Sequence, residues 1–174
     1  MTVFKTTLCV LLLWSSAQAQ AFELFKTFQT PEAFLAEVFS GSPPEPSVLN
    51  IGSAEQARIS PVFGRAFPQS RLRYWAKDGK TVWIFDDIGK EGYVPTTCGF
   101  VVQDGVLDHL RVLIYRESRG EQVGEPSFLQ QLIGARANGA DVDKAVDNIS
   151  GATLSVLMMK RMARTAIELD ALIQ

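Results

Sequence analysis

Two short runs in the middle of the chain, residues 72–76 and 81–85, are rich in the apolar, aromatic and β-branched residues that strands favour. The segment between them contains Asp78-Gly79, a pair that suits the two-residue turn of a hairpin because both positions tolerate a positive φ. The pattern therefore predicts an antiparallel β-hairpin across residues 72–85.

A second pair of runs repeats this arrangement. Residues 93–102 and 106–115 flank a turn that contains Asp104-Gly105, so they are predicted to be two further strands. Strict alternation is broken around His109 in the second of them. The core candidates of this last strand are Leu107, Val112 and Ile114.

Helix signals precede the predicted strands. Thr30 is a suitable N-cap and a proline follows it, which predicts a short helix that ends before the proline-rich surface connection 41–46. Ser53 and Gln56 have the spacing of a capping box and predict a second short helix that stops near Pro61.

The C-terminal third also has helix signals. Residues 126–133 predict a short helix closed by Gly134, and residues 135–146 are rich in small and polar residues and predict a loop. Apolar residues then recur near helical spacing through 153–173, which predicts a long final helix. Its expected buried positions are Leu154, Leu157, Met158, Met162, Ile167 and Leu172. Its basic residues, expected on a solvated face, are Lys160, Arg161 and Arg164.

The most specific stretch is 147–155, which reads Asp-Asn-Ile-Ser-Gly-Ala-Thr-Leu-Ser and runs into this helix. The first turn of a helix has unpaired N–H groups and the positive end of the macrodipole, so it suits a phosphate. Gly151 and Ala152 let a ligand approach the backbone, and the hydroxyl of Thr153 lies beside that end. The alternative interpretation is a Ser-capped helix with small residues for close packing.

This stretch resembles the flavinylation motif of bacterial FMN-binding domains. Such domains occur in the G-type subunit of Rnf electron-transport complexes, in the C-type subunit of the sodium-pumping NADH:quinone reductase and in stand-alone exported proteins. In that family, a dedicated FAD:protein FMN transferase joins FMN through its phosphate to the Thr of the Ser-Gly-Ala-Thr run. The resemblance implies covalent FMN on Thr153. The matched recognition and cofactor-binding positions are Asp147, Ser150, Gly151 and Ala152.

A second resemblance follows the last predicted strand. In FMN-binding domains a strand of this kind often runs into a Glu-Thr-Pro-Gly-like corner that approaches the flavin ring. Here Glu117 and Gly120 match, whereas Ser118 replaces Thr and Arg119 replaces Pro. The resemblance implies flavin contacts from Glu117, Ser118 and Gly120, and a charged surface turn is the alternative. It also implies an α+β fold for residues 22–174, with a twisted, mostly antiparallel sheet and packed helices.

Residues 1–21 have the pattern of a signal peptide. Lys5 precedes a short apolar run, residues 8–14, and a small-residue cleavage site follows. This run is too short for a helix that spans the bilayer, which needs about 20 apolar residues. We therefore expect cleavage and export, to the periplasm in a Gram-negative source, and no membrane-spanning segment afterwards.

The composition of the chain limits the kinds of partner and site that we expect. The chain has 17 basic and 19 acidic side chains, a net charge of −2, which argues against a nucleic-acid partner. Cys98 is the only cysteine after the predicted signal peptide and is expected to be a buried strand residue. His109, the only histidine, has charged neighbours and is expected at a strand surface rather than as a ligand or base. No metal site and no catalytic residue is predicted.

A tethered flavin without a second catalytic constellation predicts an electron carrier. The protein would pass electrons between a membrane-bound redox partner and a periplasmic acceptor, as a substrate of the transferase rather than as an enzyme. One alternative is a flavin-dependent reductase with its own small-molecule substrate. The other is a cofactor-free binding or scaffold module.

Overall fold

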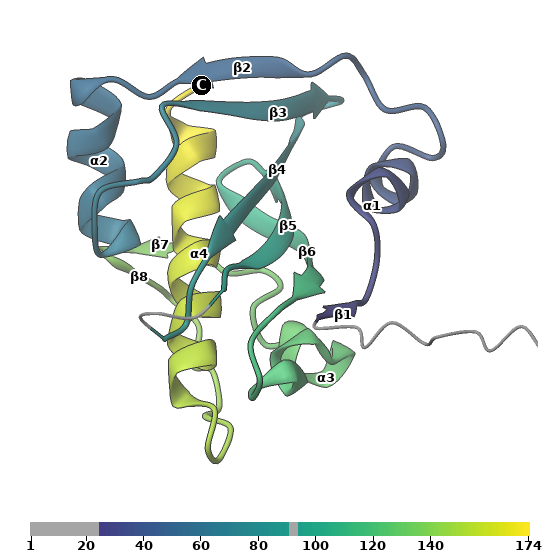
Figure 1. The fold of residues 1–174 in the computed structure, drawn as a ribbon. Coiled ribbons are helices and arrows are strands. Elements are labelled where there is room, and N and C mark those ends of the chain that lie inside the picture. The colour runs from purple at the N-terminus through teal and green to yellow at the C-terminus, as the bar shows by residue number, and fades with distance from the viewer. Residues whose placement is uncertain (1–24, 91–93) are drawn as a thin grey trace, which may run out of the picture.

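A six-stranded antiparallel sheet forms the centre of the structure, a computed structural model that describes residues 25–90 and 94–174 (Figure 1). The strand order is β1–β6–β5–β4–β3–β2. The strands are β1 (Lys26–Thr27), β2 (Ser47–Asn50), β3 (Arg71–Lys77), β4 (Lys80–Asp87), β5 (Thr96–Gln103) and β6 (Val106–Tyr115). With the helices described below, this arrangement confirms the expected α+β fold. The predicted signal peptide, residues 1–21, and Tyr93 of a predicted strand lie outside the described residues.

Helices cover both faces of this sheet. The long helix α4 (Thr153–Ala171) packs across one face with α2 (Ser53–Phe63) beside it, and α1 (Pro31–Val38) covers the other face (Figure 1). The short helix α3 (Pro126–Leu129) follows a 3₁₀ turn, η1 (Glu121–Gly124). A small hairpin of β7 (Ala137–Asn138) and β8 (Asp141–Val142) lies against α4. No helix in the described residues is both long and apolar enough to cross a membrane.

Both predicted hairpins are present. In the β3–β4 turn, Asp78 and Gly79 have φ angles of 53° and 75°, and Asp104 and Gly105 have 52° and 69° in the β5–β6 turn. Positive φ at both central residues matches the right-handed twist of the strands, which is why Asp-Gly sequences specify these turns. Because β4 also pairs with β5, the two hairpins lie side by side and β3, β4, β5 and β6 follow chain order in the sheet.

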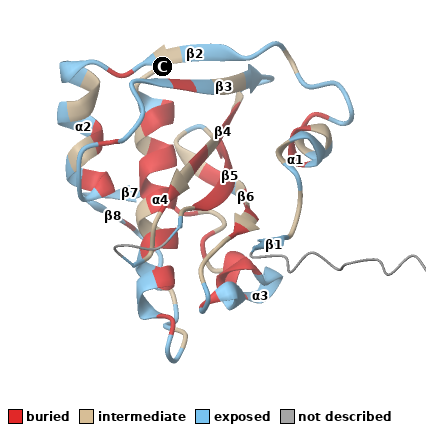
Figure 2. Ribbon diagram, viewed as in Figure 1, coloured by how far each residue is buried: buried red, intermediate tan, exposed pale blue. Residues whose placement is uncertain are grey.

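The core has two parts because the central strands are covered on both faces. Along β4, Trp83 and Phe85 belong to the large cluster under α4, and Val82 belongs to a smaller cluster under α1. Seven of the eight residues of β5 are buried, the polar Thr96 and Thr97 among them, because both faces of this strand are covered (Figure 2). Cys98 is another of these buried residues, as predicted, and its Sγ lies 3.7 Å from Sδ of Met159.

The buried face of α4 differs from the prediction. Met158, Met162 and Ile167 are buried as expected, but Leu154 and Leu157 are 47% and 49% exposed. The inward stripe runs instead through Ser155, Val156, Met159, Ala163 and Ala166. The sequence pattern indicated an apolar helix correctly, but the orientation of its first turn depends on the residues it packs against.

The expected solvated face of basic residues on α4 is also wrong. Arg164 is 7% exposed because the β7–β8 hairpin lies over it, and its Nε donates to the carbonyl oxygen of Gly139 at 2.9 Å. Arg161 forms an ion pair with the buried carboxylate of Asp87, 2.7 Å away, at the end of β4. Lys160 forms one with Asp141 of β8, also at 2.7 Å. These side chains connect α4 to the β7–β8 hairpin and to the end of β4.

Three local predictions need correction. The N-cap of α2 is Gly52, which has no side chain to cap the helix; its N–H donates to Glu55 at 2.9 Å, so the helix begins one residue earlier than the predicted capping box implies. The helix also continues past Pro61 to Phe63, because a proline removes only one donor from a helix that is close to its end. Strand β2 and the β7–β8 hairpin occupy segments without a strand pattern.

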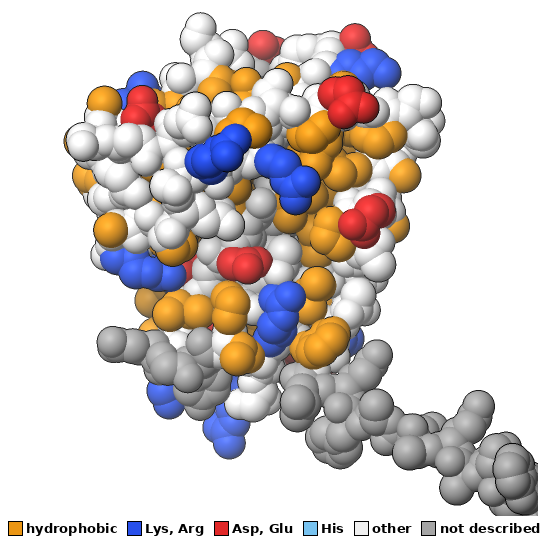
Figure 3. Space-filling view, turned by 45° about the horizontal axis from the view of Figure 1, so that its top comes forward, with side chains coloured by type: hydrophobic (Ala, Val, Ile, Leu, Met, Phe, Trp, Pro, Cys, Tyr) orange, Lys and Arg blue, Asp and Glu red, His pale blue; other side chains and the backbone are white. Residues whose placement is uncertain are grey.

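The helix at Thr30 is confirmed, and its N-cap hydroxyl accepts from the N–H of Ala33 at 3.2 Å. The predicted helix 126–133 is α-helical only in α3, although Phe128, Leu129 and Leu132 are buried as expected. On the face drawn in Figure 3, basic and acidic side chains are interspersed rather than gathered in fields of one sign, in keeping with the small net charge.

Candidate functional site

The first turn of α4 presents one side of the candidate site. The helix begins at Thr153, and its N-cap, Ala152, offers no side-chain acceptor to the first-turn N–H groups. Gly151 reaches the turn with a φ of 78°, which glycine adopts without strain. Thr153 is exposed, and its Oγ1 accepts a hydrogen bond from Nδ2 of Asn148 at 3.0 Å. An accessible hydroxyl therefore stands beside the positive end of a 19-residue helix.

The loop that follows β6 presents the other side. It contains Glu117, Ser118, Arg119 and Gly120, which are the residues of the second motif. Ser118 and Arg119 are exposed, Glu117 is partly buried and Gly120 is buried. The loop ends where Gly120, at a φ of 89°, starts the 3₁₀ turn η1.

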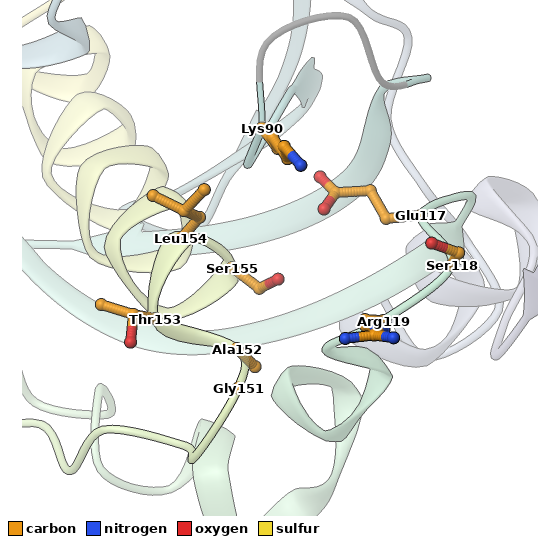
Figure 4. Close-up of a pocket in the computed structure, with 9 residues that line it drawn as sticks. All are labelled: Lys90, Glu117, Ser118, Arg119, Gly151, Ala152, Thr153, Leu154 and Ser155. Carbon is orange, nitrogen blue, oxygen red and sulfur yellow. The ribbon is translucent and has the colours of Figure 1, made fainter.

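These two segments, about 30 residues apart in the chain, meet across one pocket of about 610 Å³ (Figure 4). Its lining residues are Lys90, Glu117, Ser118, Arg119, Gly151, Ala152, Thr153, Leu154 and Ser155. Figure 4 shows Lys90 and Glu117 extending toward each other on one side, and Arg119 facing the turn that contains Gly151. Among the sequence-predicted site residues, the structure thus brings Glu117 and Ser118 together with the start of α4.

Asp147 and Ser150 lie outside this lining. Both are exposed on the loop that leads into α4, and the backbone N–H of Asp147 donates to Oε1 of Gln131 at 2.8 Å. Their side chains are therefore accessible to another protein, which is compatible with a role in recognition. Gly120 is also absent from the lining but lies directly behind it, in contact with Ser155.

A hydrogen-bonded pair joins the two segments at the base of the pocket. Ser155 is 3% exposed, and its Oγ lies 3.2 Å from the phenol oxygen of Tyr115, the last residue of β6. The same phenol donates to the backbone carbonyl of Arg119. The Ser155 hydroxyl is thus engaged and buried, in contrast to the accessible hydroxyl of Thr153.

Glu117 is held from the β4–β5 connection. The N–H of Gly89 donates to its Oε1 at 2.7 Å, and a side chain at Gly89 would collide with the carboxyl group, since a Cβ there would be 2.8 Å from it. Burial raises the pKa of Glu117 above its ordinary value of 4.5, with a further increase from the charge of Asp87, while the Gly89 hydrogen bond opposes the change.

Asp87 fixes the start of that connection. Its carboxylate is fully buried and accepts from Arg65 at 2.6 Å, from Arg161 at 2.7 Å and from the N–H of Ile88 at 2.8 Å. Because Arg161 belongs to α4, this cluster ties the helix to the segment that positions Lys90 and Glu117. The pocket is therefore braced from behind by a buried ionic cluster.

The charges at the pocket favour an anion. The guanidinium of Arg119 has no hydrogen bond or ion pair with any residue in the described ranges, and Lys90 supplies a second cationic side chain. The first turn of α4 adds the positive end of the helix dipole. Glu117 is the one acidic side chain of the lining. Within residues 25–90 and 94–174, no group of three His, Cys, Asp or Glu residues is placed to hold a metal ion.

The sequence does not predict four of the lining residues as site residues: Lys90, Arg119, Leu154 and Ser155. Arg119 occupies a motif position where it departs from the family pattern. The sequence pattern predicts a buried Leu154, and Lys90 lies in a connection without a motif. His109 lies on β6 with its ring stacked on Phe34 of α1, so it belongs to the face of the sheet opposite α4.

Comparison with known proteins gives one match. Residues 89–168 match the family model described as the FMN-binding domain. This span begins at the β4–β5 connection and includes both motif segments and most of α4. No curated protein and no solved structure matches the chain.

Proposed function

We propose that this chain binds FMN, since residues 89–168 match the FMN-binding domain family, and that the FMN is attached through a phosphoester bond to Thr153. We further propose that the protein acts outside the cytoplasm as a one-domain electron carrier. The observation that carries the proposal is the meeting of the two motif segments around one pocket, with the hydroxyl of Thr153 at its edge.

The pocket fits a flavin nucleotide. Its volume of about 610 Å³ lies within the usual range of small-molecule sites, roughly 300–1,000 Å³. The uncapped start of α4 and the small residues Gly151 and Ala152 suit a phosphate, which has to approach the backbone closely. Leu154 adds apolar surface for a ring, and Arg119 can pair with an anionic or carbonyl oxygen.

Thr153 is the hydroxyl best placed for the linkage. Ser155 is buried and bonded to Tyr115, and Ser150 is exposed but lies outside the pocket lining. In the attachment step, the Thr153 oxygen forms an ester bond to the phosphorus of the FMN half of FAD. The anhydride bond of FAD breaks, AMP leaves, and the hydroxyl proton is released. The FAD:protein FMN transferase is the proposed catalyst, and the exposed side chains of Asp147 and Ser150 are the proposed recognition points.

Bound flavin supplies the redox chemistry, and the protein supplies attachment, orientation and local charge. Glu117 is fixed by Gly89, and Arg119 of the same loop contributes positive charge. The carrier role and the periplasmic location are supported by the signal-like residues 1–21 and by the value of a permanent tether where no pool of free FMN replaces a lost cofactor. The donor is proposed to be a membrane-bound redox protein.

The covalent linkage is tested by producing the protein with and without the transferase. The parent, Thr153→Val, Ser155→Ala and Ser150→Ala proteins are separated under denaturing conditions, and flavin fluorescence and intact mass are recorded. Only Thr153→Val should lose covalent flavin, because it keeps the side-chain shape and removes the nucleophilic oxygen. Asp147→Ala should reduce modification without removing the acceptor.

Two results would contradict the proposal. Covalent flavin on Thr153→Val protein, or a modified peptide that maps to Ser150 or Ser155, would refute the attachment site. A parent protein that stays colourless beside a competent transferase would favour a cofactor-free module. Steady turnover of a small acceptor by the purified flavoprotein, without a partner protein, would favour a reductase over a carrier.

A further inference from the structure

The hydroxyl of Tyr115 lies where the two sides of the pocket meet. Tyr115 is 2% exposed, ends β6 and belongs to neither motif. Its hydroxyl contacts the carbonyl oxygen of Arg119 in the loop after β6, and Oγ of Ser155 in the first turns of α4. A single buried phenol therefore connects the two segments that line the pocket.

The direction of these two hydrogen bonds follows from their chemistry. A carbonyl oxygen can only accept, so the phenol proton goes to Arg119, and the Ser155 hydroxyl donates to the phenol oxygen. Burial raises the pKa of Tyr115 to about 12, although the Ser155 hydrogen bond opposes the change. The phenol therefore keeps its proton, and this bond its donor, throughout the neutral range.

Gly120 shows how closely the loop approaches this pair. A Cβ at Gly120 would lie 2.3 Å from Oγ of Ser155 and 2.8 Å from the phenol oxygen of Tyr115. Its φ of 89° is also one that other residues rarely adopt. The backbone at this point is thus fitted against the two hydroxyls, with no room for a side chain.

We propose that Tyr115 is a positioning residue whose hydroxyl fixes loop 117–120 against the first turns of α4 and thereby sets the surroundings of the flavin. The loop carries Glu117 and Arg119, the charged groups that face the start of α4 across the pocket. Its other anchor is the Gly89–Glu117 hydrogen bond, so loss of the Tyr115 hydroxyl releases the end nearer Arg119. This inference rests on the proposed FMN binding.

The first test measures the flavin in Tyr115→Phe, which keeps the ring and removes only the hydroxyl. Tyr74→Phe is the matched control, since Tyr74 lines a separate hollow at the far end of α4. Covalent flavin should remain in both variants, because Thr153 is exposed and its hydroxyl is hydrogen-bonded to Asn148, not to Tyr115. At a fixed applied potential, the ratio of oxidised to reduced flavin should change by about threefold or more in Tyr115→Phe, the size of a modest hydrogen-bond effect, and stay at the parent value in Tyr74→Phe.

Ser155→Ala provides an independent perturbation of the same contact. It should shift the flavin ratio in the same direction, and the double variant should shift it by less than the sum of the two single changes, as residues in one network do. A parent-like ratio in both single variants would overturn the proposal. If Tyr115→Phe does not fold, the flavin ratio of Ser155→Ala tests the proposal by itself, and a parent-like ratio in that variant would overturn it.

The second test needs no flavin. Trypsin cleaves after arginine, and the Arg119–Gly120 peptide bond contains the carbonyl that Tyr115 holds. In the Thr153→Val background, cleavage at this bond should be several-fold faster with Tyr115→Phe and unchanged with Tyr74→Phe, because proteolysis follows local opening. Equal cleavage rates would contradict the proposal that the Tyr115 hydroxyl holds loop 117–120 in place. Faster cleavage in this background, combined with a parent protein that stays without flavin beside a competent transferase, would support the role of Tyr115 and reject the proposed function.

Discussion

The substitution Asp87→Asn tests how much the buried ion pairs of Asp87, which lie behind the pocket, stabilise the fold. Asp87→Asn keeps the shape of the side chain and removes its charge. The carboxylate is fully buried and bonded to Arg65, Arg161 and the N–H of Ile88. The amide can still accept from Ile88, but its NH₂ group would face an arginine donor, so at least one arginine contact is lost.

The expected loss of stability depends on how exposed the two arginine partners of Asp87 are. Removing one member of a buried ion pair costs about 3–5 kcal/mol, since the other charge stays buried without a partner. Here the side chains of Arg161 and Arg65 are 25% and 40% exposed, so both can recover part of this cost from water. We therefore expect a loss of about 2–3 kcal/mol in the free energy of unfolding, below the full range for a buried pair.

Urea denaturation followed by tryptophan fluorescence measures this loss. With a slope of about 2 kcal/mol per molar urea, the midpoint should fall by about 1–1.5 M. Asp86→Asn is the matched control, because Asp86 is the preceding residue of β4, partly exposed and without an ion pair in the described residues. An Asp87→Asn midpoint within about 0.25 M of the parent, at equal slope, would show that the buried cluster does not stabilise the fold.

Two further substitutions test the other face of the sheet. Gly99→Ala should cost about 1–3 kcal/mol by overpacking, because the new Cβ would lie 2.4 Å from the ring of Phe34, and Phe34→Leu in the same protein should restore part of the loss in a urea titration. Burial and the nearby Arg111 cation lower the pKa of His109 from 6.5, against the opposing charges of Glu37 and Asp108. The folded state then binds fewer protons than the unfolded state, so this residue's contribution is complete above about pH 6.5 and declines as the pH falls toward the lowered pKa. His109→Gln should therefore lose less stability than the parent between about pH 7.5 and 5, and identical pH dependences would reject this assignment.

Local sequence determined the features whose physics is local. Asp-Gly at two turns specified two hairpins, since positive φ at both positions suits few other residues. Thr30 and the following proline specified the start of α1 in the same way. The apolar residues of β6 also indicated a strand with buried positions, although its alternation is broken around His109. Leu107 and Val112 are buried as expected, whereas Ile114 is only partly buried.

Other elements exist only because a partner pairs with them. Strand β2 has one partly buried residue and no strand pattern, but it forms the edge of the sheet by pairing with β3. Arg164 has the sequence of a solvated helix position and is buried because the β7–β8 hairpin covers it. Such contacts join residues far apart in the chain, so the local sequence pattern does not indicate them.

The candidate site shows the same division. The residues 147–155 and Glu117–Gly120 could be singled out from the sequence by resemblance, and the family match covers both. Their meeting around one pocket, the exposure of the Thr153 hydroxyl and burial of that of Ser155, and the positions of Lys90 and Tyr115 were decided by the tertiary structure. The physical reason is that a helix start and a loop acquire a common pocket only when the sheet between them fixes their separation.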